Sequence, residues 1–282
     1  MTDTERLLKA RSFVELGARQ RARALLDSGS FRELLGPFDR QMSPWLPRQG
    51  IVPQADDGVV IAKGTLAGQP TLIAAIEGAF QGGSMGEVGG AKIAGALELA
   101  IEDNRQGIPM RAVLLLETGG VRLQEANLGL AAIAEIQAAI VELRGYQPVI
   151  GLIAGSVGCF GGMSIAAGLC THLLVTREAR LGLNGPQVIE QEAGIGEYDA
   201  RDRPFIWGLT GGEQRHACGL ADGYVDDDVE SIRRQLIELA DTPSRQRCQR
   251  HHEYLERLAQ LGADVAQLDA AAVRTLYQGE LS

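Results

Sequence analysis

The chain has 282 residues, of which 45% are hydrophobic, so it can bury a substantial core within one large domain. Its net charge of −9 argues against a nucleic-acid-binding surface, although a local basic patch remains compatible with a phosphorylated ligand. The sequence contains neither a membrane-spanning apolar run nor a signal-peptide pattern, which predicts a cytoplasmic protein.

The four cysteines show no spacing of the kind that zinc sites use. Cys159, Cys170, Cys218 and Cys248 form no CxxC pair. We therefore expect reduced, mostly buried thiols and no metal.

The N-terminal part of the chain reads as helical. Residues 4–35 have an amphipathic pattern with two candidate capping boxes, which begin at Ser12 and Ser30 and predict two short helices joined at residues 27–30. A connector with proline and tryptophan then leads to two apolar runs, 59–63 and 71–76, separated by a turn at 67–70. These runs predict a β-hairpin that opens the core.

From residue 81 onward, strands, glycine-rich loops and helices alternate. The pattern predicts helices over 86–104, 127–143 and 163–168, strands over 111–116, 148–153 and 171–175, and glycine clusters over 81–90 and 155–162. Such alternation favours an α/β fold with right-handed crossovers and a mostly parallel sheet, whose ligands bind beyond the carboxyl ends of the strands. We divide the chain into an N-terminal helical segment (1–50), an α/β core (51–228) and a C-terminal helical appendage (229–282).

The two glycine clusters predict a site built from backbone amides. Glycine lets the main chain approach a ligand closely, so each loop can direct N–H groups at a phosphate or a developing oxyanion. Lys92, on the helix that follows the first cluster, is either a supplementary phosphate ligand or a solvated surface lysine. Chemistry of this kind requires no histidine, metal or reactive cysteine.

Two side-chain mechanisms compete with this interpretation. The spacing Gly82-x-Ser84-x-Gly86 matches the nucleophile elbow of α/β-hydrolases, with Asp222 and either His251 or His252 as partners, but the preceding strand ends too early for a sharp turn. The pair Glu117 and Glu125 is compatible with the acid and base of a hydratase. Arg122 lies between them and is positioned to pair with a carboxylate and fix the shape of the loop.

Several motifs taken together resemble a known family. Residues 18–33, 57–60, 64–68, 82–92, 119–125, 158–162, 185–189 and 211–216 resemble, in the same order, segments of the carboxyltransferase branch of the crotonase superfamily. Within this branch the chain is most similar to the β subunits of biotin-independent malonate decarboxylases, from Ala18 to about Asp228. Each motif alone is weak, and their collinear succession carries the resemblance.

The resemblance implies a crotonase-like fold, a ββα superhelix, with helical extensions at both ends. No cysteine precedes position 159, so the zinc ribbon of the bacterial acetyl-CoA carboxylase β subunit is missing. Only one crotonase unit is present, whereas propionyl-type carboxyltransferases carry two in tandem. The resemblance therefore implies a γ subunit as the second unit, with an acyl-carrier protein and an acyl-transferase α subunit as further partners.

The implied reaction is decarboxylation of a malonyl thioester on the carrier protein's CoA-like phosphopantetheine arm, through an enolate and without biotin. Gly161 and Gly162 are the implied oxyanion donors. The implied arm-binding residues are Gly82, Gly83, Ser84, Met85, Gly86, Lys92, Gly119, Gly120 and Arg122. Two alternatives remain: the β subunit of a biotin-dependent acyl-CoA carboxyltransferase, and a non-catalytic scaffold that binds acyl-CoA.

Overall fold

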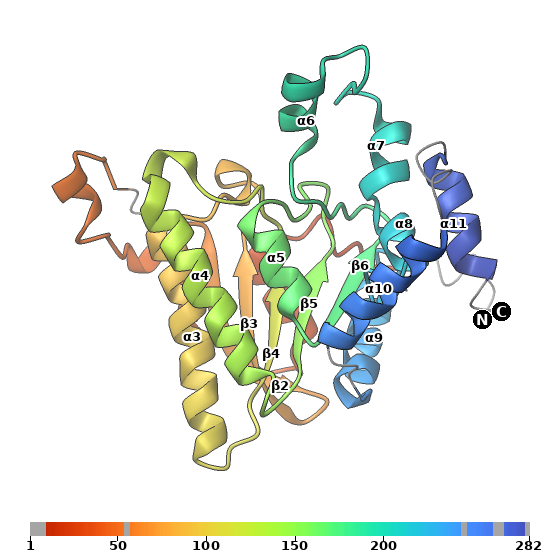
Figure 1. The fold of residues 1–282 in the computed structure, drawn as a ribbon. Helices are drawn as coiled ribbons and strands as arrows, with labels where there is room; N and C mark the ends of the chain where they lie inside the picture. The colour runs from red at the N-terminus through yellow and green to blue at the C-terminus, as the bar shows by residue number, and fades with distance from the viewer. Residues whose placement is uncertain (1–9, 54–56, 244–246, 262–267, 280–282) are drawn as a thin grey trace.

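The computed structural model describes residues 10–53, 57–243, 247–261 and 268–279, and the described part centres on one seven-stranded sheet (Figure 1). The strands are β1 (Arg32–Leu35), β2 (Val59–Leu66), β3 (Gln69–Ile76), β4 (Arg111–Leu115), β5 (Val149–Ile153), β6 (His172–Thr176) and β7 (Gly223–Val225). Their spatial order is the chain order. Strands β1 to β3 pair antiparallel and β3 to β7 pair parallel, which confirms the expected hairpin and the mostly parallel sheet.

Helices cover both faces of this sheet. On one face, α3 (Glu87–Arg105), α4 (Ala126–Leu143) and α5 (Gly162–Leu169) pack in a hydrophobic cluster with alternate strand residues such as Ile61 and Leu114. On the other face, α2 (Ala18–Leu25) and α9 (Val229–Asp241) pack against residues such as Ile73 and Leu152. Since every parallel strand is added on the same side of its predecessor, same-handed crossovers place α3, α4 and α5 on one face.

The N-terminal segment differs from the helical prediction. Helix α2 ends at Leu25, and the chain then forms β1, so the helix expected through residue 35 was wrong. Ser30, expected to cap a helix, accepts a hydrogen bond from the Thr65 amide. Asp27 accepts hydrogen bonds from Ala67 and Gly68 at the β2–β3 turn. Long-range pairing with the hairpin therefore replaces the second helix.

The hydrophobic cores also cross the expected domain boundaries at 50 and 228. Strand β1 belongs to the main sheet, and α9 contributes Ile232 and Leu236 to the second core cluster. The remaining helices are α6 (Pro186–Ala193), α7 (Arg203–Thr210), α8 (Gly212–Ala217), α10 (Arg247–Leu261) and α11 (Ala270–Gly279). Short 3-10 turns occur at η1 (Pro37–Asp39), η2 (Leu46–Gln49), η3 (Gln81–Gly83) and η4 (Leu123–Glu125).

Within the described ranges, no helix has the length and apolarity of a membrane span. In the same ranges, no three His, Cys, Asp or Glu side chains cluster in a way that could hold a metal ion. Cys159, Cys170 and Cys218 are buried thiols, as expected, while the side chain of Cys248 lies outside the described part.

Helices α3 and α4 approach closely through a glycine, which yields a test of the packing. A methyl carbon at Gly90 would lie 2.4 Å from Cβ of Ala132, whereas one at Gly95 on the same helix would meet nothing within 4 Å. We expect Gly90→Ala to lower the free energy of unfolding by about 1–3 kcal/mol through overpacking. The matched change Gly95→Ala should raise it by about 0.5–1 kcal/mol through helix propensity. Urea denaturation midpoints measure both, and equal midpoints would contradict the packing.

Candidate functional site

Three loops meet at the carboxyl edge of the sheet, after β3, β4 and β5. Isolated backbone bridges join Met85 to Val121 and Thr118 to Cys159, and a third joins Cys159 to Leu181 beyond β6. The two glycine clusters of the sequence therefore lie together, with the 118–122 segment between them. This convergence follows from the parallel strands, whose carboxyl ends share one edge.

A buried ion pair holds the second glycine loop in place. Oε1 of Glu117 accepts hydrogen bonds from the amides of Val157 (2.8 Å) and Gly158 (3.1 Å), and Oε2 accepts one from Nη1 of Arg21 (3.0 Å). The remaining guanidinium nitrogens donate to the carbonyl oxygens of Phe13 and Val14. Both oxygens of Glu117 are thus engaged in holding the backbone, which disagrees with an acid or base role in a hydratase.

Some glycines in the two clusters are required by packing around Glu117. A methyl carbon at Gly83 would lie 1.9 Å from the carbonyl oxygen of Glu117, and one at Gly155 would lie 1.8 Å from its Oε2. Gly83 also has a positive φ of 64°. Part of the glycine enrichment therefore reflects close approach to Glu117 and not contact with a ligand.

A second buried ion pair braces the first glycine loop. Nη1 of Arg122 lies 2.9 Å from Oε1 of Glu125, and its Nη2 donates to the carbonyl oxygen of Ser84 at 3.0 Å. Oε2 of Glu125 accepts a hydrogen bond from the amide of Glu87, at the start of α3. Arg122 thus pairs with a carboxylate and fixes the shape of the loop, which is the alternative to a hydratase that the sequence predicted. The same contacts contradict its expected place among the arm-binding residues.

The nucleophile-elbow interpretation of Ser84 is also wrong. Its backbone is ordinary extended chain (φ −62°, ψ 135°), and its hydroxyl lies 3.3 Å from Nε of Arg122. Asp222, the proposed acid, accepts hydrogen bonds from the amide of Leu173 and from Arg250. His251 and His252 are exposed on α10. The four groups therefore do not assemble into a triad.

The amides of the first glycine loop are largely used within the protein. Those of Gly83, Ser84 and Met85 donate to the carbonyl oxygens of Phe80, Gln81 and Gly120. The amide of Gly119 in turn donates to the carbonyl oxygen of Gly82, and that of Gly120 donates to Oγ1 of Thr118. Residues 83–85 therefore position the 119–122 segment, and the expected cradle of open N–H groups for the arm is not formed at residues 83–85, 119 and 120.

Both expectations for Lys92 are wrong as well. Its ammonium group is buried, lies 3.0 Å from Oδ1 of Asp57, and donates to the carbonyl oxygen of Val59 at 2.8 Å. The paired side chains are 5% and 3% exposed, so neither the solvated lysine nor the phosphate ligand fits. The sequence did not reveal this pair because Asp57 lies on a distant segment of the chain.

At the junction of the two glycine clusters, one of the two expected donors is occupied and the other has no acceptor among the described residues. Gly161 is not one of the expected donors, because its N–H donates to the carbonyl oxygen of Leu183 at 2.7 Å. Its backbone (φ 60°, ψ −147°) is a glycine conformation that turns the chain into α5. Gly162 is the first residue of α5, so its N–H has no acceptor in the helix, and the described residues provide none elsewhere.

The second unpaired amide was missed by sequence reasoning. The bridge between Met85 and Val121 uses the Gly120 carbonyl and the Arg122 amide, and no described residue accepts the N–H of Val121. A methyl carbon at Gly161 would lie 3.3 Å from Cα of Gly120 and 3.8 Å from N of Val121, so the two backbones touch. Two unpaired amides on adjacent, partly exposed segments are the components of an oxyanion site.

The thiol near this junction is unsuited to act as a nucleophile. Cys159 is fully buried, and burial, followed by the neighbouring Cys170 and the charge of Glu117, raises the pKa of its thiol well above the ordinary value. A buried thiol with a raised pKa stays protonated at neutral pH. The site therefore offers backbone N–H groups as its polar contribution to catalysis.

Comparisons with known proteins agree with this architecture. A model of the carboxyl transferase domain matches residues 13–253. A Malonomonas rubra protein named malonyl-S-ACP:biotin-protein carboxyltransferase MADC is 41% identical over 246 residues, which cover 84% of this chain and 77% of that protein.

Solved structures extend the comparison. One similar structure is a chain of a Pseudomonas malonate decarboxylase hetero-tetramer in complex with malonate. It is 72% identical with a TM-score of 0.89, and the match covers 98% of this chain and 100% of that chain. Transcarboxylase 12S, with methylmalonyl-coenzyme A bound, is 28% identical with a TM-score of 0.67, over 82% of this chain and 42% of that chain. The chain therefore belongs to the carboxyl transferase domain family, and its fold is the crotonase-like fold that the sequence motifs resemble.

Proposed function

We propose that this chain is the catalytic subunit of a malonate decarboxylase, which converts a malonyl thioester on an acyl-carrier protein into the acetyl thioester and CO₂. One observation carries the proposal: 72% identity, over 98% of the chain, to a chain of a malonate decarboxylase crystallised with malonate. The pair of unpaired amides supports it, since the reaction develops negative charge on a thioester oxygen.

The reaction breaks the bond between the malonyl α-carbon and its carboxylate carbon. The electron pair moves into the thioester as CO₂ leaves, which produces an enolate whose oxygen carries the charge. The N–H groups of Val121 and Gly162 would donate to this oxygen. One proton then adds to the α-carbon and gives the acetyl thioester. In other enzymes, one such donor is worth about 10²–10³ in kcat.

The proposed assembly contains further subunits. The described part of this chain forms one sheet unit, and it covers only 42% of the longer transcarboxylase chain. A second relative, 66% identical over 88% of this chain, was solved as a Pseudomonas malonate decarboxylase MdcD–MdcE hetero-dimer. We therefore propose a γ-type second crotonase unit, an acyl-carrier protein and an acyl-transferase subunit as partners in the cytoplasm.

A biotin-dependent carboxyltransferase remains the second candidate. The observation that favours it is the 41% identity to a protein named as a biotin-protein carboxyltransferase. There the same enolate would form, while the carboxyl group would pass to biotin on a carrier protein. We rank it second because the malonate decarboxylase chain is considerably more similar, at 72% identity.

The role of the Gly162 amide can be tested without removing a side chain. Gly162→Pro deletes the N–H at the first position of α5, where proline is tolerated. We expect kcat to fall by about 10²–10³. Gly162→Ala keeps the N–H and is the matched control, because both variants introduce a carbon 3.0 Å from Cγ2 of Ile133. Equal activities of the two folded variants in CO₂ release would remove Gly162 from the site.

Avidin separates the two candidate functions. We expect CO₂ release from malonyl-carrier protein, by this chain co-expressed with its partner subunits, to be unaffected by added biotin or avidin. A biotin-dependent enzyme would lose activity with avidin and need biotin for turnover. Absence of release from a folded complex under every condition would instead favour a non-catalytic acyl-CoA scaffold.

Ser84→Ala tests the supporting role of the first loop. Because the Ser84 hydroxyl makes one long contact with Arg122 and the carbonyl oxygen makes the shorter one, we expect kcat within about twofold of wild type. A loss comparable to that of Gly162→Pro in the same CO₂ assay would reinstate the serine as a reacting group.

A further inference from the structure

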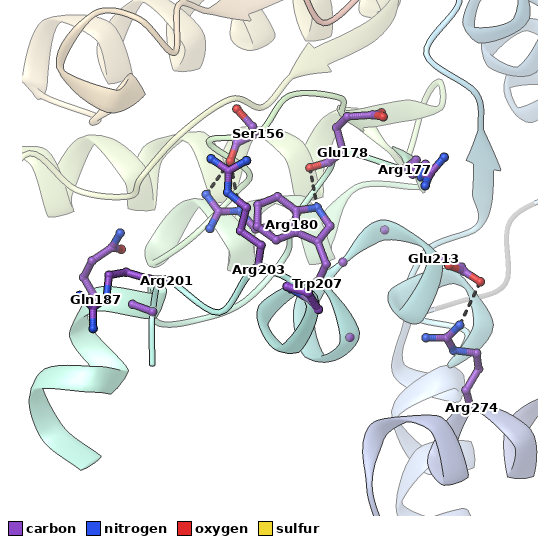
Figure 2. A pocket seen from close by; sticks show the side chains of 15 residues that line it. Ser156, Arg177, Glu178, Arg180, Gln187, Arg201, Arg203, Trp207, Glu213 and Arg274 are labelled. Carbon is purple, nitrogen blue, oxygen red and sulfur yellow. Dashed lines mark hydrogen bonds and ion pairs between the residues drawn. The ribbon is translucent and has the colours of Figure 1, made fainter. Parts of the chain in front are cut away.

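A large cavity lies next to the second glycine loop, which contributes Ser156 to its lining. Its volume is about 1070 Å³, and Figure 2 shows the side chains around it. The walls come from the loops after β5 and β6, from α6 to α8, and from α11. The lining includes Ser156, Arg177, Arg180, Arg203 and Trp207.

The lining is strongly basic in a chain whose net charge is −9. Five arginines face two glutamates, and one of these glutamates, Glu213, pairs with Arg274 at 2.9 Å. Arg177 and Arg203 are exposed, and neither makes an ion pair with a described residue. A concave surface lined by one sign of charge attracts ligands of the opposite sign.

Arg180 connects this cavity to the amide junction. Its guanidinium donates to the carbonyl oxygens of Ser156 and Val157 and lies 5.5 Å from the ring centroid of Phe160, the residue before Gly161. On its other side it lies 4.7 Å from the ring centroid of Trp207. Burial lowers the pKa of Arg180, and the positive charge of Arg203 contributes to the same direction. The loop that carries Gly162 is therefore one wall of the cavity.

The phosphate of a pantetheine arm needs a binding site that Lys92 and the amides of residues 83–85 do not supply. Lys92 is neutralised by Asp57, and the amides of Gly83, Ser84 and Met85 are hydrogen-bonded inside the protein. A guanidinium group, by contrast, presents a planar fork of donors that matches the oxygens of a phosphate. The cavity offers two such groups without carboxylate partners in the described part of the chain.

We propose that this arginine cavity binds the phosphate end of the CoA-like arm that carries the malonyl thioester, with Arg177 and Arg203 as phosphate ligands. The inference rests on the proposed function, because it takes the acyl group to be a pantetheine thioester. The thioester would lie at Val121 and Gly162, and the arm would pass over the Ser156–Phe160 loop into the cavity. The volume accommodates the phosphate together with neighbouring parts of the arm.

Trp207 provides a direct reporter of occupancy. The chain has two tryptophans, so the full-length Trp45→Phe protein leaves Trp207 as the sole indole fluorophore. We expect CoA to change this fluorescence with saturation, and pantetheine, which lacks the phosphates, to bind at least about tenfold more weakly. The affinity for CoA should also fall as the salt concentration rises.

Arginine variants in the same background test the two proposed ligands. Arg177→Gln and Arg203→Gln should each weaken CoA binding by roughly tenfold, with Arg203→Lys intermediate. Arg234→Gln is the matched control, since Arg234 is an exposed arginine on α9 that is not among the residues lining the cavity. Circular dichroism verifies that each variant is folded.

In the CoA titrations, any one of three results would overturn the proposal: no CoA binding, equal binding of CoA and pantetheine, or an effect of Arg177→Gln and Arg203→Gln no larger than that of Arg234→Gln. Binding of the carrier protein, measured with and without its arm, shows whether the cavity binds the phosphate of the carrier's arm or only the phosphates of free CoA. Equal binding of the armless carrier would assign the cavity to an acidic protein surface and reject the arm. Fluorescence measures binding without turnover, so CoA binding in a complex that releases no CO₂ would count against the proposed function alone.

Discussion

The buried ion pair between Arg21 and Glu117 is the contact on which the loop architecture depends. It joins the N-terminal helix α2 to the end of β4 and, through the amides of Val157 and Gly158, to the loop that leads into α5. A buried charge is costly unless its partners satisfy it, and here both ions have several. Arginine suits the position because its fork reaches one carboxylate and two carbonyl oxygens at once.

Around this pair the glycines have different tasks. Gly83 and Gly155 allow the chain to approach Glu117, Gly161 turns the backbone, and Gly162 leaves an amide unpaired. A glycine-rich motif is therefore a mixture of packing, turning and donating positions. Only the full hydrogen-bond pattern identifies the donating positions.

Much of the fold could be predicted because its signals are local. The apolar runs of β2 to β6 and the helical periodicity of α3 and α4 lie where the sequence places them. The prediction was wrong where distant contacts decide the outcome. Strand β1 exists because it pairs with β2, and Lys92 is buried because Asp57 neutralises it. The Gly161 amide is occupied by the carbonyl of Leu183, about twenty residues later, which no local pattern reveals.

The use of main-chain amides as donors has an evolutionary consequence. A backbone N–H is present whichever residue occupies the position, unless it is proline, so ordinary mutation does not erase it. The arginines that line the neighbouring cavity are side chains, and each can be replaced one codon at a time. A lineage with this architecture can therefore vary the lining of the cavity while the proposed oxyanion site is inherited unchanged.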